Sequence, residues 1–429
     1  MSLSAPARDL IYNFISSQIE LEKLSLNALN QYIYTNPELR HEEHKAHDFL
    51  TSILEKLDFV VTRHAHGLKT AFRAEFSAKG GGRNIAVNAE YDALPGLDKH
   101  ACGHTTAAVA TAISVAGALK HFSLPGTITL LGTPAEEGGG GKITMLQNHA
   151  YENIDACLMT HPSHLSQVYF RSIAGLTDLS ITYQGRKAHS GIAPWDGVNS
   201  LDAITLMWAS VGLMRQQLMP TDRVSGVITD GGAANNVCPD FSKGSFGIRA
   251  ENVGRLEVVK EKVLNCARGA AKATGCECGV IDDGWLYADV RTNDVIAGRY
   301  EAHLEMLGRP WVEGKDEQKR NVFGGGTDMG NVSYVVSFPA ASVLMVPSIH
   351  PTFDIGCKEG CHTNEFYEAA GTYHAFEECL LSAKGMAFSA IDIMLDDEVY
   401  GDMKEEFEAM KKDIGDCKAI FGNTALNSA

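Results

Sequence analysis

The sequence predicts an α/β protein with a mixed, largely parallel sheet and a smaller α+β domain inserted into the chain. Two observations support this fold class. Before Gly175, short apolar runs alternate with helix-like segments, an order typical of parallel strands joined by helices. Near Gly175 the period changes, because Leu179, Ile181 and Tyr183 alternate with polar residues as in a half-buried strand.

The elements of the larger domain follow from local patterns. Residues 10–57 are expected to be helical because their leucines recur at roughly helical spacing, and Pro37 interrupts that pattern. The Ala-rich segment 105–120 predicts a buried helix, and a second helix is expected to start within 141–149. Strands are expected at residues 59–62, 71–76, 85–89, 127–131 and 156–159.

The smaller domain is expected over residues 175–289, between 1–174 and 290–429, which form the larger domain. Strands are expected at 223–229 and 244–250, with helices at 200–217 and 256–274. Two strand–helix–strand passes indicate a ferredoxin-like α+β sandwich.

Composition excludes several classes of protein. The 429 residues are 45% hydrophobic, enough for a sizeable core, and the net charge of −16 argues against a nucleic-acid partner. The sequence has no apolar run long enough to span a membrane and no apolar core of signal-peptide length at its start. We therefore expect a cytoplasmic protein whose cysteines are mostly small buried hydrophobes.

Metal-type ligands follow apolar runs at four places in the chain. They are Cys102 and His104 after strand 85–89, the pair Glu136-Glu137 after strand 127–131, His161 after strand 156–159, and His362 after the apolar stretch 341–346 and a loop. Open α/β sheets bind ligands at the carboxyl ends of their strands. Thiolate, imidazole and carboxylate together predict a metal site, zinc above all, and the second glutamate of the pair predicts hydrolysis.

Each motif has a plainer interpretation when it is taken alone. Cys102 could be a buried thiol and His104 a helix-capping residue, the glutamate pair could be a solvated turn, and Asp92 could be a turn residue before Pro95. His100 could be a ligand, a partner of a ligand or a structural residue. Their joint occurrence at several strand ends favours a site.

Longer motifs resemble the co-catalytic metallopeptidase family of aminoacylase, hippuricase and auxin-conjugate hydrolases. The branch that is most similar includes p-aminobenzoyl-glutamate hydrolase and the β-alanyl-lysine-type dipeptidase. The resemblance spans nearly the whole chain. It is carried by Glu90-Tyr-Asp-Ala-Leu-Pro95, His100-Ala-Cys-Gly-His104, Thr133-Pro-Ala-Glu-Glu-Gly-Gly-Gly-Gly-Lys142, Gly185-Arg-Lys-Ala-His-Ser190, Gly231-Gly-Ala-Ala-Asn-Asn-Val-Cys-Pro239 and Gly325-Gly-Thr-Asp-Met-Gly330.

The resemblance implies a role for ten residues. The metal ligands would be Cys102, His104, Glu137, His161 and His362, with Glu136 as general base and Asp92 as supporting carboxylate. His189 would polarise the scissile carbonyl, often across a dimer interface, while Asn236 and Arg249 would hold the substrate's carboxylate. Two departures stand out: Thr105 follows His104 where many relatives have Asp or Asn, and Glu90 occupies a position often filled by His or Asp.

The resemblance implies a zinc-peptidase catalytic domain in residues 1–174 and 290–429, and a lid and dimerisation domain in 175–289. We expect a homodimeric hydrolase of small dipeptides or N-acyl amino acids with a free carboxylate. Two divalent ions are expected, zinc first, with manganese or cobalt as alternatives. The alternatives are an amide-forming or rearranging biosynthetic enzyme, and a catalytically silent binding protein.

Overall fold

The computed structural model describes residues 4–79, 81–96, 100, 103–282, 284–311, 313–322, 324–334 and 346–414. Over these residues the chain divides into two compact units. Unit 1 takes its residues from Met1–Arg171, Val290–Phe323 and Thr327–Cys417, and unit 2 from Ser172–Asp289 and Gly324–Gly326. Unit 2 therefore begins at Ser172 rather than at residue 175, and it includes a short glycine segment from beyond residue 289.

Unit 1 contains a six-stranded sheet in the order β1-β2-β4-β3-β5-β12. The strands are β1 (Val60–Arg63), β2 (Phe72–Phe76), β4 (Thr127–Gly132), β3 (Asn84–Ala89), β5 (Ala156–Leu158) and β12 (Ser348–Ile349). The pairs from β4 to β12 are parallel, while β1–β2 and β2–β4 are antiparallel. The expected mixed, largely parallel sheet is confirmed. Its central strands are apolar runs because both of their faces are buried.

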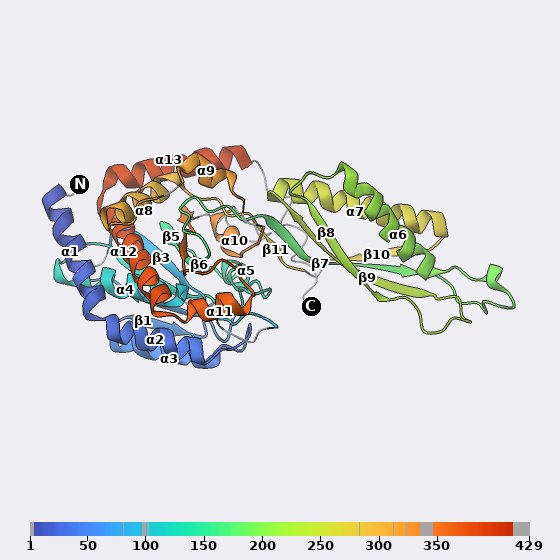
Figure 1. The fold of residues 1–429 in the computed structure, drawn as a ribbon, viewed down its shortest axis with the longest axis horizontal. Helices are drawn as coiled ribbons and strands as arrows, with labels where there is room; N and C mark the ends of the chain where they lie inside the picture. Colours follow the sequence, from blue (N-terminus) through green and yellow to red (C-terminus); the bar gives the residue numbers. More distant parts are fainter. Residues whose placement is uncertain are drawn as a thin grey trace. The chain divides into compact units, whose positions relative to one another are not determined.

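Helices α4 (His104–His121) and α12 (Tyr373–Leu395) pack against β3 and against each other, and α1 (Ala5–Leu21) packs on both (Figure 1). Small side chains let α4 approach its neighbours closely. The other helices and strands of unit 1 are α2 (Lys23–Thr35), α3 (His44–Lys56), α5 (Gly141–Gln147), α8 (Asp294–Met306), α9 (Lys315–Arg320), α10 (Met329–Ser333), α11 (Asn364–Ala370), α13 (Asp397–Ile414), β6 (His161–Ser163) and β13 (Thr352–Asp354). Within the described part of the chain, every helix is too short or too polar to traverse a bilayer.

Unit 2 is an antiparallel sheet in the order β10-β7-β9-β8 (Figure 1). Two helices connect strands of this sheet along the chain. Its elements are β7 (Ala174–Gln184), α6 (Ser200–Met214), β8 (Arg223–Asp230), β9 (Phe241–Ala250), α7 (Val253–Thr274), β10 (Glu277–Ile281) and β11 (Leu286–Tyr287), with short turns of 3-10 helix at Pro194–Asp196 and Arg215–Gln217. This succession of strands and helices is the ferredoxin-like sandwich that the sequence predicts.

Differences from the expected elements are small and have local causes. The helix expected at 200–217 ends at Met214 and continues as a 3-10 turn. Strand β9 begins at Phe241 rather than 244, because it extends along β7 as far as Gln184. The sequence pattern does not single out β10, since its side chains are mostly exposed and show no alternation. The stretch 341–346 lies outside the described residues, apart from Val346.

A buried carboxylate joins three helices of unit 1. Asp392 of α12 accepts hydrogen bonds from the Tyr12 hydroxyl of α1 and, at 3.0 Å, from His303 Nε2 of α8. Burial alone would raise the pKa of Asp392, but its hydrogen bonds to His303 and Tyr12 and the charge of His303 bring the pKa below its ordinary value. The carboxylate is therefore ionised and ties the N-terminal helix to the core.

The variant Asp392→Ala should destabilise unit 1 by at least about 2 kcal/mol, because each buried group left without its partner costs about 1–3 kcal/mol. A fall of roughly 5 °C or more in melting temperature is expected by calorimetry. Asp402→Ala, at an exposed position of α13, is the matched control. Equal melting temperatures for the two variants would contradict this role.

Candidate active site

Three candidate ligands meet at the carboxyl ends of the parallel strands. Glu90 follows β3, His104 opens α4 and His161 opens β6 just after β5; each offers a ligand atom within 4.8 Å of the others. The His104 Nε2 atom is 3.8 Å from Glu90 Oε2. The rings of His104 and His161 stack with centroids 5.0 Å apart. Of these three, His104 and His161 are ligands predicted from the sequence, and the structure brings them together at the strand ends.

The donor atoms fit a divalent cation. His104 Nδ1 is buried and has no hydrogen-bond partner in the described part of the chain. Burial lowers the pKa of His161 to about 4, and burial with the nearby His161 and His100 holds the pKa of His104 well below its usual value. Both imidazoles are therefore neutral, the form that binds metal. Neutral imidazoles beside a carboxylate are a donor set suited to zinc.

His100 is buried behind this group. Its ring centroid lies 6.0 Å from that of His104, and burial lowers its pKa to about 4. Cys102 lies outside the described residues.

The two glutamates follow a turn at the end of β4, and their carboxylates lie in different groups of side chains. Ala135 has a positive φ of 60° and its N–H donates to Glu43 Oε1 at 2.9 Å. Beyond this turn, the Glu136 carboxylate lies in a group with Glu90 and Asp328, all within 4.8 Å of one another. Glu137 Oε2 instead lies 3.7 Å from His362 Nε2. The adjacent carboxylates therefore serve different groups of side chains.

Asp92 has a contact that the sequence did not suggest. Its Oδ2 accepts a hydrogen bond from the backbone N–H of Glu137 at 2.9 Å, so it braces the glutamate turn. The resemblance had implied only that Asp92 is a supporting carboxylate. His362, in the loop before α11, has a φ of 71° and a side chain that is 56% exposed. A positive φ at a non-glycine residue is uncommon and often marks a functional position.

Burial of like charges perturbs the acids strongly. Burial raises the pKa of Glu137 to about 8 and that of Asp92 to about 7, with further contributions from neighbouring carboxylates. Burial, together with the charges of Glu90 and Glu137, holds the pKa of Glu136 well above its usual value. A divalent cation would favour the ionised forms, which is a second reason why this group suits one.

The remaining candidates lie in unit 2, at two ends of its sheet. His189 pairs with Val237 in an isolated antiparallel β-bridge, and the Ser190 N–H donates to the Asn236 carbonyl at 3.0 Å. His189 and Asn236 therefore lie close together. Arg249 pairs in the sheet with Gly175, and its Nη1 donates to the Gly324 carbonyl at 3.0 Å. All three candidates are exposed.

The length of β9 sets the separation of these candidates. Phe241, at the His189 end, pairs with Gln184, and the eight residue steps from Phe241 to Arg249 span about 26 Å at a rise of about 3.3 Å per residue. Unit 2 therefore brings His189 and Asn236 together and leaves Arg249 at the opposite end.

The sequence assigned no role to three residues of the site: Lys142, His350, and Asp328 of the group with Glu90 and Glu136. Lys142 has a fully buried side chain and pairs with Glu90 and Asp328. His350 is 2% exposed, its ring is 5.9 Å from that of His161, and neither ring nitrogen has a partner in the described part of the chain. The signal for Lys142 was present in the sequence: an ionisable residue closes the glycine run after the glutamates.

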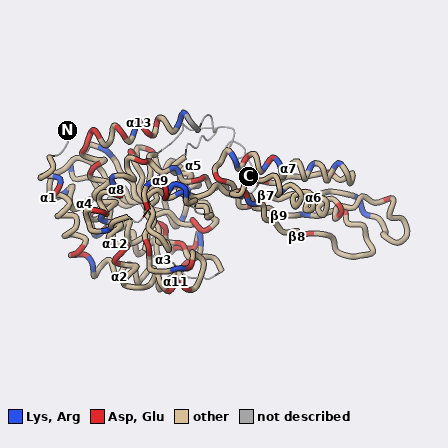
Figure 2. The backbone as a smooth tube through the Cα atoms, turned by 45° about the horizontal axis from the view of Figure 1, so that its top comes forward, with Lys and Arg blue, Asp and Glu red and all other residues tan. Residues whose placement is uncertain are grey.

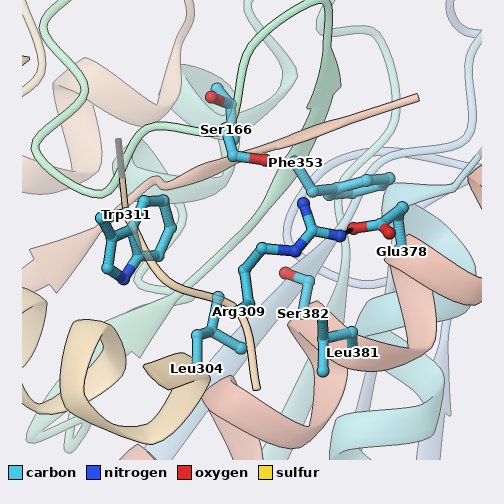
Figure 3. A pocket seen from close by; sticks show the side chains of 9 residues that line it. Ser166, Leu304, Arg309, Trp311, Phe353, Glu378, Leu381 and Ser382 are labelled. Carbon is cyan, nitrogen blue, oxygen red and sulfur yellow. Dashed lines mark hydrogen bonds and ion pairs between the residues drawn. The ribbon is translucent and has the colours of Figure 1, made fainter. Parts of the chain in front are cut away.

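A separate small pocket lies beside β13 (Figure 3). Its lining includes Thr352 and Phe353 of β13, Ser382 of α12, and the ion pair of Arg309 with Glu378. These two charges satisfy each other, and the pocket holds none of the candidate ligands. We assign it no role in the site.

The fold and the site define a class of protein: an α/β enzyme with carboxylates and imidazoles gathered at its strand ends. Residues 86–376 match the family model for peptidase family M20/M25/M40. A mouse Xaa-Arg dipeptidase is 36% identical over 94% of this chain and 94% of its own length. One of the p-aminobenzoyl-glutamate hydrolase polypeptides of Escherichia coli is 27% identical over 93% of this chain and 95% of its own length.

A solved Bacillus subtilis structure, described as a dinuclear metal-binding peptidase of family M20, superposes with a TM-score of 0.64 at 18% identity, covering 87% of this chain and 99% of the other. The chain belongs to peptidase family M20. It is a metal-dependent hydrolase of the amide bond in small dipeptides or N-acyl amino acids.

The stability of metal-free protein should depend on pH in a defined direction. Asp92 and Glu137, with folded-state pKa values of about 7 and 8, bind protons that the unfolded chain has released. Their contribution is complete below about pH 4 and is lost as the pH rises through the folded-state values. After chelation, the melting temperature should fall between about pH 5 and 8 relative to that of metal-loaded protein. Parallel curves for the two forms would contradict the expectation, and Glu137→Gln should flatten the difference.

Proposed function

We propose that the chain cleaves dipeptides or N-acyl amino acids with two divalent ions, zinc first, with manganese and cobalt as alternatives. Cys102, His104, Glu137, His161 and His362 would hold these ions. The observation that carries the proposal is the separation of Glu136 from Glu137 into two groups of side chains. Dipeptides ending in arginine are the first substrates to test, because the mouse and human relatives are named for them.

The proposed mechanism assigns each side chain one task. Divalent ions, when bound, lower the pKa of water and polarise a carbonyl group. Glu136 accepts the proton of the attacking water and passes it to the leaving amine, a task suited to a carboxylate whose pKa is raised by burial. His189 donates a hydrogen bond to the substrate's carbonyl oxygen as negative charge develops there. Arg249, with Asn236, binds the substrate's terminal carboxylate.

Substituting each of the two glutamates should have a different effect on metal content and turnover. Glu136→Gln keeps the size of the side chain and removes the base, so turnover should fall by about 100-fold or more while metal content is retained. Glu137→Gln should instead lose metal. Elemental analysis and initial rates on an arginine dipeptide measure the two effects. Loss of metal from Glu136→Gln with retention by Glu137→Gln would reverse the roles, and near-normal turnover of Glu136→Gln would exclude the mechanism.

We further infer a twofold dimer in which each site combines two chains. Within one unit 2, His189 and Asn236 lie beyond the Phe241 end of β9, and Phe241 is itself about 26 Å along the strand from Arg249 at a rise of about 3.3 Å per residue. One substrate cannot contact both ends. A twofold dimer would bring His189 and Asn236 of one chain to the substrate bound by Arg249 of the other. β8, at the edge of the sheet, exposes Val227 (54%) and Ile228 (37%), as an interface strand would.

Mixing inactive variants tests the shared site. His189→Ala mixed with Arg249→Ala should recover about a quarter of wild-type activity, because half of randomly reassorted dimers are mixed and each of these has one intact site. His189→Ala mixed with Asn236→Ala is the matched control. Both lesions lie at the same end of β9, so no site is intact. If the first mixture stays as inactive as the control, the shared site is wrong.

The remaining proposals concern partners and location. We propose a cytoplasmic enzyme acting on small substrates that bear a free carboxylate, with neither nucleic acid nor membrane as partner. The net charge of −16 supports the absence of a nucleic-acid partner. Figure 2 shows both signs of charge along α13, which is acidic in its first turn and basic in its last turn.

A further inference from the structure

A buried ammonium group lies inside the acidic half of the site. Lys142 is the second residue of α5, and its side chain is fully buried. Its Nζ donates to the Glu90 carboxylate and, at 2.5 Å, to Asp328 Oδ1. Its backbone N–H donates to the other oxygen of Asp328, Oδ2, at 2.8 Å. Asp328 thus accepts hydrogen bonds from both the main chain and the side chain of the same lysine.

The same carboxylates would otherwise suit a metal ion. Glu90, Glu136 and Asp328 each offer an oxygen within 4.8 Å of the others, a spacing that a divalent cation could bridge. Two of these three carboxylates already bind the lysine ammonium. A second cation within this group would face the repulsion of a fixed positive charge at close range.

The lysine has little freedom to move away. It follows Gly141, where an added Cβ would lie 1.7 Å from the Pro134 carbonyl oxygen, so the start of α5 packs directly on the turn that carries the glutamates. Its partners are nearly as inaccessible: Asp328 is fully buried and Glu90 is 3% exposed. While one oxygen of Glu90 is held by Lys142, the other faces His104 Nε2 at 3.8 Å.

We propose that Lys142 is a built-in cation that occupies the group formed by Glu90, Glu136 and Asp328, and so confines divalent ions to the side of His104, His161 and Glu137. Lys142 is a positioning residue: it acts through Glu90 rather than on the substrate. Glu90 then serves as a link between the ammonium and His104. The location of the divalent ions rests on the proposed function, but the role of the ammonium does not.

The first experiment uses chelator-treated protein without substrate. Lys142→Ala should melt below wild type, and ethylammonium should restore its melting temperature saturably by entering the vacated space. Ethanol, of similar size but neutral, should not restore it, and wild type should respond to neither. Equal effects of ethylammonium and ethanol, or none, would overturn the proposal. This result is independent of hydrolysis, so failure of the proposed function would leave it standing.

A second experiment counts metal ions at matched free zinc. Lys142→Met should bind about one more equivalent than wild type, because the three carboxylates lose their internal cation. Adding Asp328→Asn to this variant should remove the extra equivalent. Lys120→Met, which removes an exposed lysine paired with Asp58 at 2.9 Å, is the matched control and should leave the stoichiometry unchanged. Identical stoichiometry in Lys142→Met and wild type would overturn the proposal.

A double variant that also removes one negative charge keeps the proposal testable if Lys142→Met folds poorly. Replacing Glu90 with Gln in the same chain removes one of the uncompensated carboxylates. The double variant should therefore be more soluble and melt higher than Lys142→Met alone. If the double variant is no better than the single one, the lysine acts by volume rather than by charge, and the proposal fails.

Discussion

The site depends on burying several carboxylates against one another at the ends of parallel strands. Glu90, Asp92, Glu136 and Glu137 all have pKa values raised by burial, and the buried ammonium of Lys142 balances only part of their charge. Like charges in a medium of low dielectric constant repel strongly unless cations or protons neutralise them. Metal binding and the buried lysine are two responses to this single constraint, whereas the imidazoles beside the acids are neutral because they are buried.

Backbone geometry makes that arrangement possible. Consecutive side chains of a strand point to opposite faces, so Glu136 and Glu137 can serve one site only if the strand has ended. The strand ends at Gly132, and a turn through Ala135 follows. The Glu43 carboxylate accepts a hydrogen bond from the Ala135 N–H, and the Asp92 carboxylate accepts one from the Glu137 N–H. This turn directs the carboxylates of Glu136 and Glu137 to different groups of side chains. The glycine at 141 then lets α5 start against this turn, which brings Lys142 into the acidic group. One turn thus places the proposed base, a proposed ligand and the proposed internal cation.

The two units divide the work of the enzyme. Unit 1 carries the candidate ligands because the ends of its parallel strands converge at one edge. Unit 2 is a ferredoxin-like sandwich whose sheet keeps His189 with Asn236 and holds Arg249 apart from them. An antiparallel sheet with a long central strand is a rigid spacer, so groups at its two ends act on one substrate only if a second chain supplies half of them. The proposed dimer is a consequence of strand length.

The sequence alone determined the fold class, the order of elements and the candidate ligands, because these depend on local periodicity and on residue types that follow each apolar run. The strands of 85–89, 127–131 and 156–159 were found for this reason, and so were His104 and His161 beyond them. Tertiary structure alone decided which of these side chains touch. The partners of Lys142 are 52 and 186 residues away along the chain. His350 approaches His161 from the segment that follows β12, and Asp92 accepts a hydrogen bond from the backbone N–H of Glu137. Such contacts arise from the packing of segments far apart in sequence, which no local pattern encodes.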